Sequence, residues 1–278
     1  MKRIGQTKRI GLVAGGGQFP LLFSHKARLR GYSVFAAAFR SETDPALADC
    51  VSAVEWLYLG QVSRLLRFFR KHEVTEAVMV GTIQKTRMFT DVRPDIKAIA
   101  LVAGMRHTHD DGLLRAFAAL MEREGVRILP STLLLPELLV SEGCWTQRRP
   151  SASELDDVRI GWRIAKAVGA LDIGQSIVVG GGSVLAVEAI DGTDATILRG
   201  GRLGAGNAVV VKVCKPEQDV RFDMPAVGAR TIETMQESGA RVLAVEAEKA
   251  VVFDREKMIE LADRWGISVL GLRDHDYR

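Results

Sequence analysis

The segment Lys215–Pro225 (KPEQDVRFDMP) concentrates acidic and basic side chains in the second half of the chain, and a proline lies near each of its ends. It follows the apolar run Ala208–Val213, so we expect it to begin at the carboxyl end of a strand. Carboxylates such as Asp219 and Asp223 are ligands that Mg²⁺ prefers, and neighbouring lysine or arginine can neutralise phosphate oxygens. The segment therefore suits phosphoryl transfer, and it suits a solvated surface loop equally well.

A second polar cluster, residues 106–112 (RHTHDDG), precedes a helix expected at Leu113–Glu124. Either Asp110 or Asp111 is in position to cap that helix, while its neighbour, about 100° around the axis, faces a ligand or metal. A role in capping the helix, without any ligand, also accounts for this pair of aspartates. The H-x-H-x-D pattern ending at Asp111 occurs in zinc hydrolases, but only one histidine follows it, which is too few for such a site.

The third candidate is the glycine turn Gly15–Gly17 with Gln18, which joins an expected strand, Arg9–Ala14, to an expected helix, Phe19–Arg30. Glycines let the backbone approach a phosphate, and the N–H groups of a helix N-terminus favour an anion. A tight turn that binds nothing is the alternative.

The dinucleotide fingerprint G-x-G-x-x-G is not met, because Pro20 stands at its third glycine. Arg40 lies near the end of the second expected strand, where an acidic residue would bind the ribose of NAD. An NADP-dependent oxidoreductase therefore stays open as an alternative, as does a UDP-sugar-binding regulatory protein without chemistry.

Glu188–Asp194 (EAIDGTD) is a smaller polar group after another expected strand. Its Asp191-Gly192 pair is typical of a turn, and Thr193 is expected to cap a short helix.

The elements that must position these residues alternate between strand and helix in the first half, which predicts a parallel, doubly wound sheet. Residues 141–154 interrupt the periodicity and read as a linker. We therefore expect a Rossmann-like domain at 1–140 and a catalytic domain at 155–278. The fold class is α/β, with a less regular mixture of helices and short strands in the second domain.

Composition narrows the functional classes. The 278 residues are 47% apolar, but no run approaches the length of a membrane-spanning helix, and no secretory leader is recognisable. Three isolated cysteines fit the reducing cytoplasm. Residues 1–150 hold 22 basic and 14 acidic residues, and residues 151–278 hold 16 and 20, so a basic half precedes an acidic half. Basic and aromatic residues do not alternate, so we expect no nucleic acid partner.

Four of these segments occur in an order that resembles a known family. GGGQFP, HDDGLLRA (His109–Ala116), VEAIDGTD (Val187–Asp194) and KPEQDVRFDMP, followed by Gly228 and Thr231, are similar to the UDP-2,3-diacylglucosamine pyrophosphatases of lipid A biosynthesis, in their LpxI-type form. The resemblance extends over about residues 8 to 272, essentially the whole chain.

This resemblance implies hydrolysis of UDP-2,3-diacylglucosamine to UMP and 2,3-diacylglucosamine 1-phosphate (lipid X), by attack at the β-phosphorus. It also implies Mg²⁺ or a similar divalent cation, a homodimer formed by exchange of the C-terminal part, and a C-terminal domain of unusual fold. The acylated substrate and the basic half lead us to expect a cytoplasmic protein that contacts the inner membrane transiently.

The same resemblance points to the catalytic aspartate and to the aspartate pair, whereas the substrate-binding residues are our own assignment. Asp223, in its R-F-D-x-P context, is expected to be catalytic, and Asp110, Asp111 and Asp223 are expected to hold the metal. The residues expected to bind substrate are Gly15, Gly16, Gly17, Gln18, Thr82, Lys85, Glu188, Thr193, Lys215, Gln218 and Thr231.

Overall fold

The computed structural model describes residues 8–83, 92–103 and 110–274, without the side chains of Asp110 and Asp111. Lys85 lies outside the described residues. The chain forms two compact units. Unit 1 comprises Met1–Pro136 and Asp219–Asp223, and unit 2 comprises Glu137–Gln218 and Met224–Arg278.

Unit 1 is a doubly wound α/β unit, as the alternating sequence pattern predicts. Its parallel sheet has the strand order β3-β2-β1-β4-β5. The elements in chain order are β1 (Lys8–Ala14), α1 (Phe19–Leu29), β2 (Tyr32–Phe39), α2 (Leu47–Cys50), β3 (Ala53–Leu57), α3 (Val62–Lys71), β4 (Glu76–Val80), α4 (Ile96–Ala103), α5 (Asp110–Arg123) and β5 (Arg127–Leu129).

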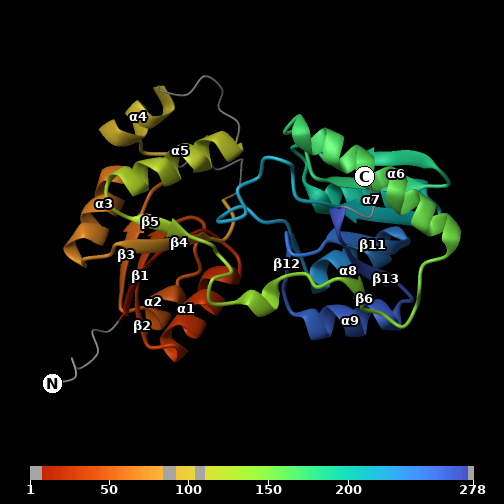
Figure 1. Ribbon diagram of the computed structural model, residues 1–278, viewed down its shortest axis with the longest axis horizontal. Helices are drawn as coiled ribbons and strands as arrows, with labels where there is room; N and C mark the ends of the chain where they lie inside the picture. Colours follow the sequence, from red (N-terminus) through yellow and green to blue (C-terminus); the bar gives the residue numbers. More distant parts are fainter. Residues whose placement is uncertain (1–7, 84–91, 104–109, 275–278) are drawn as a thin grey trace. The chain divides into compact units, whose positions relative to one another are not determined.

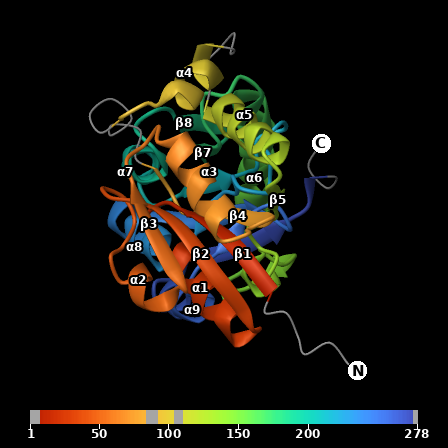
Figure 2. The same ribbon diagram turned by 90° about the vertical axis from the view of Figure 1, so that its left-hand side faces the viewer.

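Helices cover both faces of this sheet (Figures 1 and 2), with α1 and α2 on one side and α3 and α5 on the other. The α3 side is a continuous core in which Val13 and Met79 of the strands pack with Leu65 of α3 and Met121 of α5. Strands buried on both faces need apolar residues at consecutive positions, which explains the uninterrupted runs in β1 and β4.

Unit 2 is built on a six-stranded mixed sheet of order β6-β13-β11-β9-β7-β8. β9, β11 and β13 are mutually parallel, and β6, β7 and β8 run antiparallel to their neighbours. The elements are a 3₁₀ turn (Pro136–Leu138), β6 (Gly143–Cys144), α6 (Ala152–Ala170), β7 (Ser176–Gly180), β8 (Ser183–Val187), α7 (Thr193–Leu203), β9 (Ala208–Lys212), β10 (Ala226–Val227), α8 (Ala229–Ser238), β11 (Ala240–Glu246), β12 (Val251–Val252), α9 (Arg255–Arg264) and β13 (Ser268–Leu272).

Alternate residues of these strands face two cores. Val210 packs with residues of α7, α8 and α9, while Val209 and Val211 pack against Trp162 of α6. This period of two is the expected consequence of a pleated sheet covered on both sides. The fold-class prediction, a parallel N-terminal sheet followed by a mixed α/β unit, is confirmed.

Two details differ from the sequence-based expectation. Helix α5 already includes Asp110 and Asp111, so both aspartates belong to the helix instead of preceding a helix that begins at Leu113. Thr193 is the first residue of α7, whose N-cap is Gly192, and it makes no capping bond. None of the described helices is long and apolar enough to cross a bilayer.

Asp95 fixes the start of two helices in unit 1. One carboxylate oxygen accepts the Ser63 N–H near the start of α3 at 2.6 Å, and the other accepts the Ala98 N–H of α4 at 3.1 Å. Both N–H groups belong to first turns, which have no partner inside their own helix.

We expect Asp95→Ala to lower the free energy of unfolding by about 2 kcal/mol, because two first turns lose a cap. Urea unfolding measures this loss. Asp156→Ala removes an exposed carboxylate that bonds Arg159 of its own helix, and it should cost less than about 0.5 kcal/mol. Equal losses for the two variants would contradict the double-cap interpretation.

Candidate functional site

In unit 1 the carboxyl ends of β1 and β4 form a topological switch point. The chain builds β1, β2 and β3 outward in one direction and then returns to add β4 on the other side of β1. Doubly wound sheets bind ligands outside the carboxyl ends of their strands at such a point. The glycine turn after β1 lies here, where the sequence leads us to expect a substrate site.

The glycines of this turn lie against neighbouring backbone. The Gly15 N–H donates to the Val80 carbonyl at 2.8 Å, and the Gly16 N–H donates to the Thr82 carbonyl at 2.7 Å. A Cβ on Gly15 would stand 2.7 Å from the Thr82 carbonyl oxygen, and one on Gly16 would stand 2.9 Å from that of Glu42. Chain packing therefore explains these two glycines, and their amides are already engaged within the protein.

Gly17 and Gln18 differ from the two glycines before them. Both are exposed, and Gly17 has φ +82 with open space beside its Cα. Gln18 is the N-cap of α1, a helix with no acidic residue in its first turn. Within this turn they are the residues whose surroundings leave room for a ligand. Substrate contact by the four residues Gly15 to Gln18 and by the exposed Thr82 stays a prediction.

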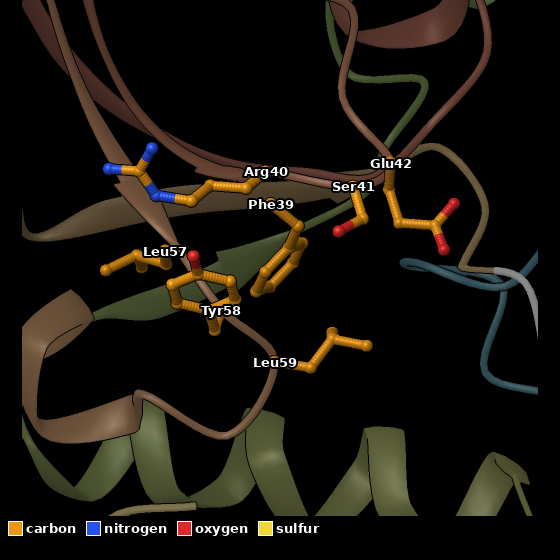
Figure 3. A pocket seen from close by; sticks show the side chains of 7 residues that line it. All are labelled: Phe39, Arg40, Ser41, Glu42, Leu57, Tyr58 and Leu59. Carbon is orange, nitrogen blue, oxygen red and sulfur yellow. The ribbon is translucent and has the colours of Figure 1, made fainter. Parts of the chain in front are cut away.

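A small hollow lies at the carboxyl ends of β2 and β3 (Figure 3). Tyr58 lines it, with the Arg40 guanidinium 5.7 Å and the Arg93 guanidinium 3.8 Å from its ring centre. Arg40 therefore lies where the NADP alternative requires a basic residue. Of the two glycines at fingerprint positions, Gly15 is accounted for by packing and Gly17 is not, while Pro20 occupies the third position, so the NADP interpretation stays an untested alternative.

The segment Asp219–Asp223 belongs to unit 1, although its sequence neighbours on both sides belong to unit 2. Arg221 binds the Asp219 carboxylate through Nε at 3.0 Å and through a second nitrogen at 2.8 Å, and it reaches Glu122 of α5 at 2.9 Å. Its carbonyl accepts the buried Ser131 N–H at 2.6 Å. Phe222 packs against the α3-side core. We call these four contacts the Arg221 clamp.

The clamp sets the charge state of its own groups. The hydrogen bond from Arg221 is the largest cause that lowers the pKa of Asp219, and the bond to Asp219 in turn raises the pKa of Arg221. Asp219 is therefore a paired carboxylate at neutral pH.

Asp223, the expected catalytic residue, closes this segment. It is half-buried, and its N–H donates to the Asp219 carbonyl at 3.0 Å, which forms a tight turn. The clamp therefore fixes the backbone of Asp223 from four residues upstream.

In unit 2 the expected residues Glu188 and Thr193 come together. The Thr193 hydroxyl donates to the Glu188 carboxylate at 2.8 Å and accepts a hydrogen bond from Lys212 Nζ at 3.1 Å. Lys212 and Glu188 are both buried. The chain of contacts ends at the Ala226 carbonyl, 2.9 Å from Lys212 Nζ. Lys212 was missed by sequence reasoning, although a lysine that ends the apolar run AVVVK is a recognisable signal.

Lys215, Gln218 and Thr231 are engaged in local structure. Gln218 accepts the Lys215 N–H at 3.0 Å, and Lys215 Nζ donates to Asp172 at 2.6 Å. The Thr231 hydroxyl accepts the Gly228 N–H at the start of α8 at 3.3 Å. Their contact with substrate stays a prediction.

A buried carboxylate that forms an ion pair also lies at the carboxyl ends of β9 and β11. Glu246 is 1% exposed, and it accepts bonds from Lys166 Nζ at 2.6 Å and from the Cys214 N–H at 2.8 Å. The pair holds the chain immediately before Lys215. Sequence reasoning missed it, since Lys166 and Glu246 are distant in sequence.

The described side chains contain no group of three or more His, Cys, Asp or Glu arranged to hold a metal ion. Mg²⁺ needs only one or two carboxylates when substrate phosphates and waters complete its shell. Among the expected ligands Asp223 can supply one such carboxylate, and the side chains of Asp110 and Asp111 lie outside the described residues.

Comparison with known families accounts for both halves of the chain. Residues 9–138 match the family described as LpxI N-terminal domain, and residues 141–270 match the LpxI C-terminal domain. The chain belongs to the LpxI family. The resemblance inferred from four short motifs is thereby confirmed.

One curated relative is the UDP-2,3-diacylglucosamine pyrophosphatase LpxI of Caulobacter vibrioides, which is 29% identical over 276 residues, covering 95% of this chain and 98% of the relative. Similarity to solved structures is much weaker. The biotin carboxylase domain of Hydrogenobacter thermophilus 2-oxoglutarate carboxylase is 14% identical at a TM-score of 0.28, over 64% of this chain and 36% of that one. An N5-carboxyaminoimidazole ribonucleotide synthetase is 12% identical at a TM-score of 0.29, over 86% of this chain and 46% of that one. This chain thus spans less than half of either enzyme.

We expect the glycine turn of this LpxI protein to tolerate a methyl group at one position and not at another. Gly15→Ala should destabilise the protein by about 2 kcal/mol or more, because the Cβ collides with backbone that cannot move away. Gly17→Ala adds only the strain of a left-handed residue, about 1 kcal/mol. Thermal unfolding compares them, and a larger loss for Gly17→Ala would refute the packing explanation.

The Arg221 clamp should respond to acid. The pKa of Asp219 is lowered in the folded protein, so its contribution to stability is present above its ordinary pKa of about 4 and is lost as pH falls through the lowered value. Asp219→Asn should therefore cost about 1 kcal/mol at neutral pH and progressively less below about pH 4.

Urea unfolding at several pH values measures this effect, and Arg221→Gln is its control. In the Arg221→Gln background the Asp219→Asn substitution should have little further effect, because its partner is already gone. Additive losses would show that Asp219 is stabilised by something else.

Proposed function

We propose that this protein hydrolyses the pyrophosphate bond of UDP-2,3-diacylglucosamine, giving UMP and 2,3-diacylglucosamine 1-phosphate for lipid A biosynthesis. The observation that carries the proposal is the match of both halves to the LpxI domains, together with a full-length relative named for this activity. The clamped acidic segment that ends in Asp223 supports it from the structure.

In the proposed reaction a water oxygen bonds to the β-phosphorus, and the bond from that phosphorus to the bridging oxygen breaks. UMP leaves with the bridging oxygen, and the water proton passes to solvent. The carboxylate of Asp223 is proposed to orient the attacking water or a bound cation. The Arg221 clamp supports this role because it fixes the turn whose last residue is Asp223.

We propose Mg²⁺ or a similar divalent cation as the cofactor, held by Asp223 with Asp110 and Asp111. When bound, it would neutralise charge on the pyrophosphate oxygens. The glycine turn through Gln18, together with Thr82 and Lys85, is proposed to bind substrate from unit 1. From unit 2 the proposed contacts are Glu188, Thr193, Lys215, Gln218 and Thr231.

Three further properties belong to the same proposal. The protein is proposed to be a homodimer, to act in the cytoplasm and to contact the inner membrane transiently. The two acyl chains of the proposed substrate are the reason for the membrane contact, since such a molecule partitions into a bilayer.

The direct test is UMP release from UDP-2,3-diacylglucosamine with Mg²⁺ or EDTA, using the wild type and Asp223→Asn. We expect release to require the metal and to fall by about 10²-fold or more in the variant, because Asn keeps the shape but not the charge. In ¹⁸O-water the label should appear in the sugar phosphate and not in UMP.

Asp156→Asn is the matched control, since it removes an exposed carboxylate of α6 and should leave the rate unchanged. No release by folded wild-type protein would refute the function. Full activity of Asp223→Asn would refute the assignment of Asp223 alone.

A further inference from the structure

Helix α4 turns its apolar side chains to solvent. Ile96 is 83% exposed, Ile99 56% and Val102 46%, and Val92, just before the helix, is 40% exposed. Positions 96, 99 and 102 follow one another along a single face of the helix. Large aliphatic residues at this exposure are ordinary when scattered, but a continuous face of them marks an interaction surface.

Other contacts hold α4 in place. Ala98 is buried and Leu101 is half-buried, Asp95 caps the first turn, and Lys97 pairs with Glu124, the residue after α5. Figures 1 and 2 both show α4 beyond α5, farther from the sheet. The apolar face is thus presented by a helix anchored on the unit.

A basic cluster lies at the start of this helix. Arg93, two residues before Asp95, stacks on Tyr58, and Arg40 lies beyond the same ring. In residues 8–83, 92–103 and 110–274 neither guanidinium pairs with a carboxylate. Glu42 lines the same hollow, but its side chain and that of Arg40 point to opposite sides (Figure 3).

We propose that α4 and the Arg40–Tyr58–Arg93 cluster dock the protein on an anionic lipid bilayer. Ile96, Ile99 and Val102 enter the boundary between headgroups and acyl chains, and the guanidiniums bind lipid phosphates. The choice of a bilayer rests on the proposed function, whose diacylated substrate resides there. A second copy of this chain is the other occupant that the test below distinguishes.

The test is co-sedimentation with phosphatidylglycerol-rich vesicles and with phosphatidylcholine vesicles. Wild type should bind the anionic vesicles better. Ile96→Asp with Ile99→Asp should weaken that binding by about tenfold or more, since two side chains lose apolar burial. Arg93→Gln should weaken binding to the anionic vesicles by about fivefold and leave binding to neutral vesicles unchanged.

The control is the double variant Leu29→Asp with Ile190→Asp. It adds the same two negative charges at exposed apolar residues outside α4, which are 71% and 81% exposed. This control should bind vesicles like wild type.

Hydrolysis in detergent micelles, where no bilayer is needed, separates this proposal from the proposed function. Unchanged micellar hydrolysis with lost vesicle binding in the α4 variant supports docking. If the wild type hydrolyses substrate but does not bind vesicles, docking is wrong and the proposed function stands; if it binds vesicles but does not hydrolyse substrate, the proposed function is wrong and docking stands. Docking is also wrong if the α4 variant binds vesicles like wild type. It is wrong, too, if sedimentation velocity shows that the variant has only lost a dimer.

Discussion

Arg221 carries the interaction on which the candidate site depends. Its guanidinium spans Asp219 and Glu122, its carbonyl holds Ser131, and the neighbouring Phe222 packs in the unit 1 core. Together these contacts attach five residues to unit 1 in the middle of a stretch that otherwise belongs to unit 2. A bidentate, charge-assisted pair is directional, so it orients the turn that ends in Asp223.

Close approach of backbone segments explains the glycine turn. Where β1, β2 and β4 end, three chain segments approach within contact distance, and only residues without a Cβ fit at Gly15 and Gly16. Gly15 and Gly16 are therefore required for the packing of the chain at this switch point, whether or not a ligand binds there. Gly17 and Gln18 are the exposed part of the turn, with open space beside the Cα of Gly17.

Unit 2 places charged residues at the carboxyl ends of apolar strands and gives each hydrogen-bond partners. Lys212 ends β9 and bonds Thr193, which bonds Glu188, while Glu246 ends β11 and pairs with Lys166. Buried charges without partners are strongly destabilising, so these hydrogen bonds offset the burial of Lys212 and Glu246. They also bring Glu188 and Thr193, which the sequence singled out separately, into one polar group.

The sequence by itself determined the α/β class, the parallel order of the first half and the family, because apolar periodicity and four short motifs are local properties. It also pointed to Asp223 through its immediate context. Only the tertiary structure decided that Asp219 is neutralised by Arg221, that Lys212 joins Thr193, and that α4 exposes its apolar face. These outcomes depend on contacts between residues far apart in the chain, such as Arg221 with Glu122, and no local pattern encodes which distant partner a charge or an apolar face will meet.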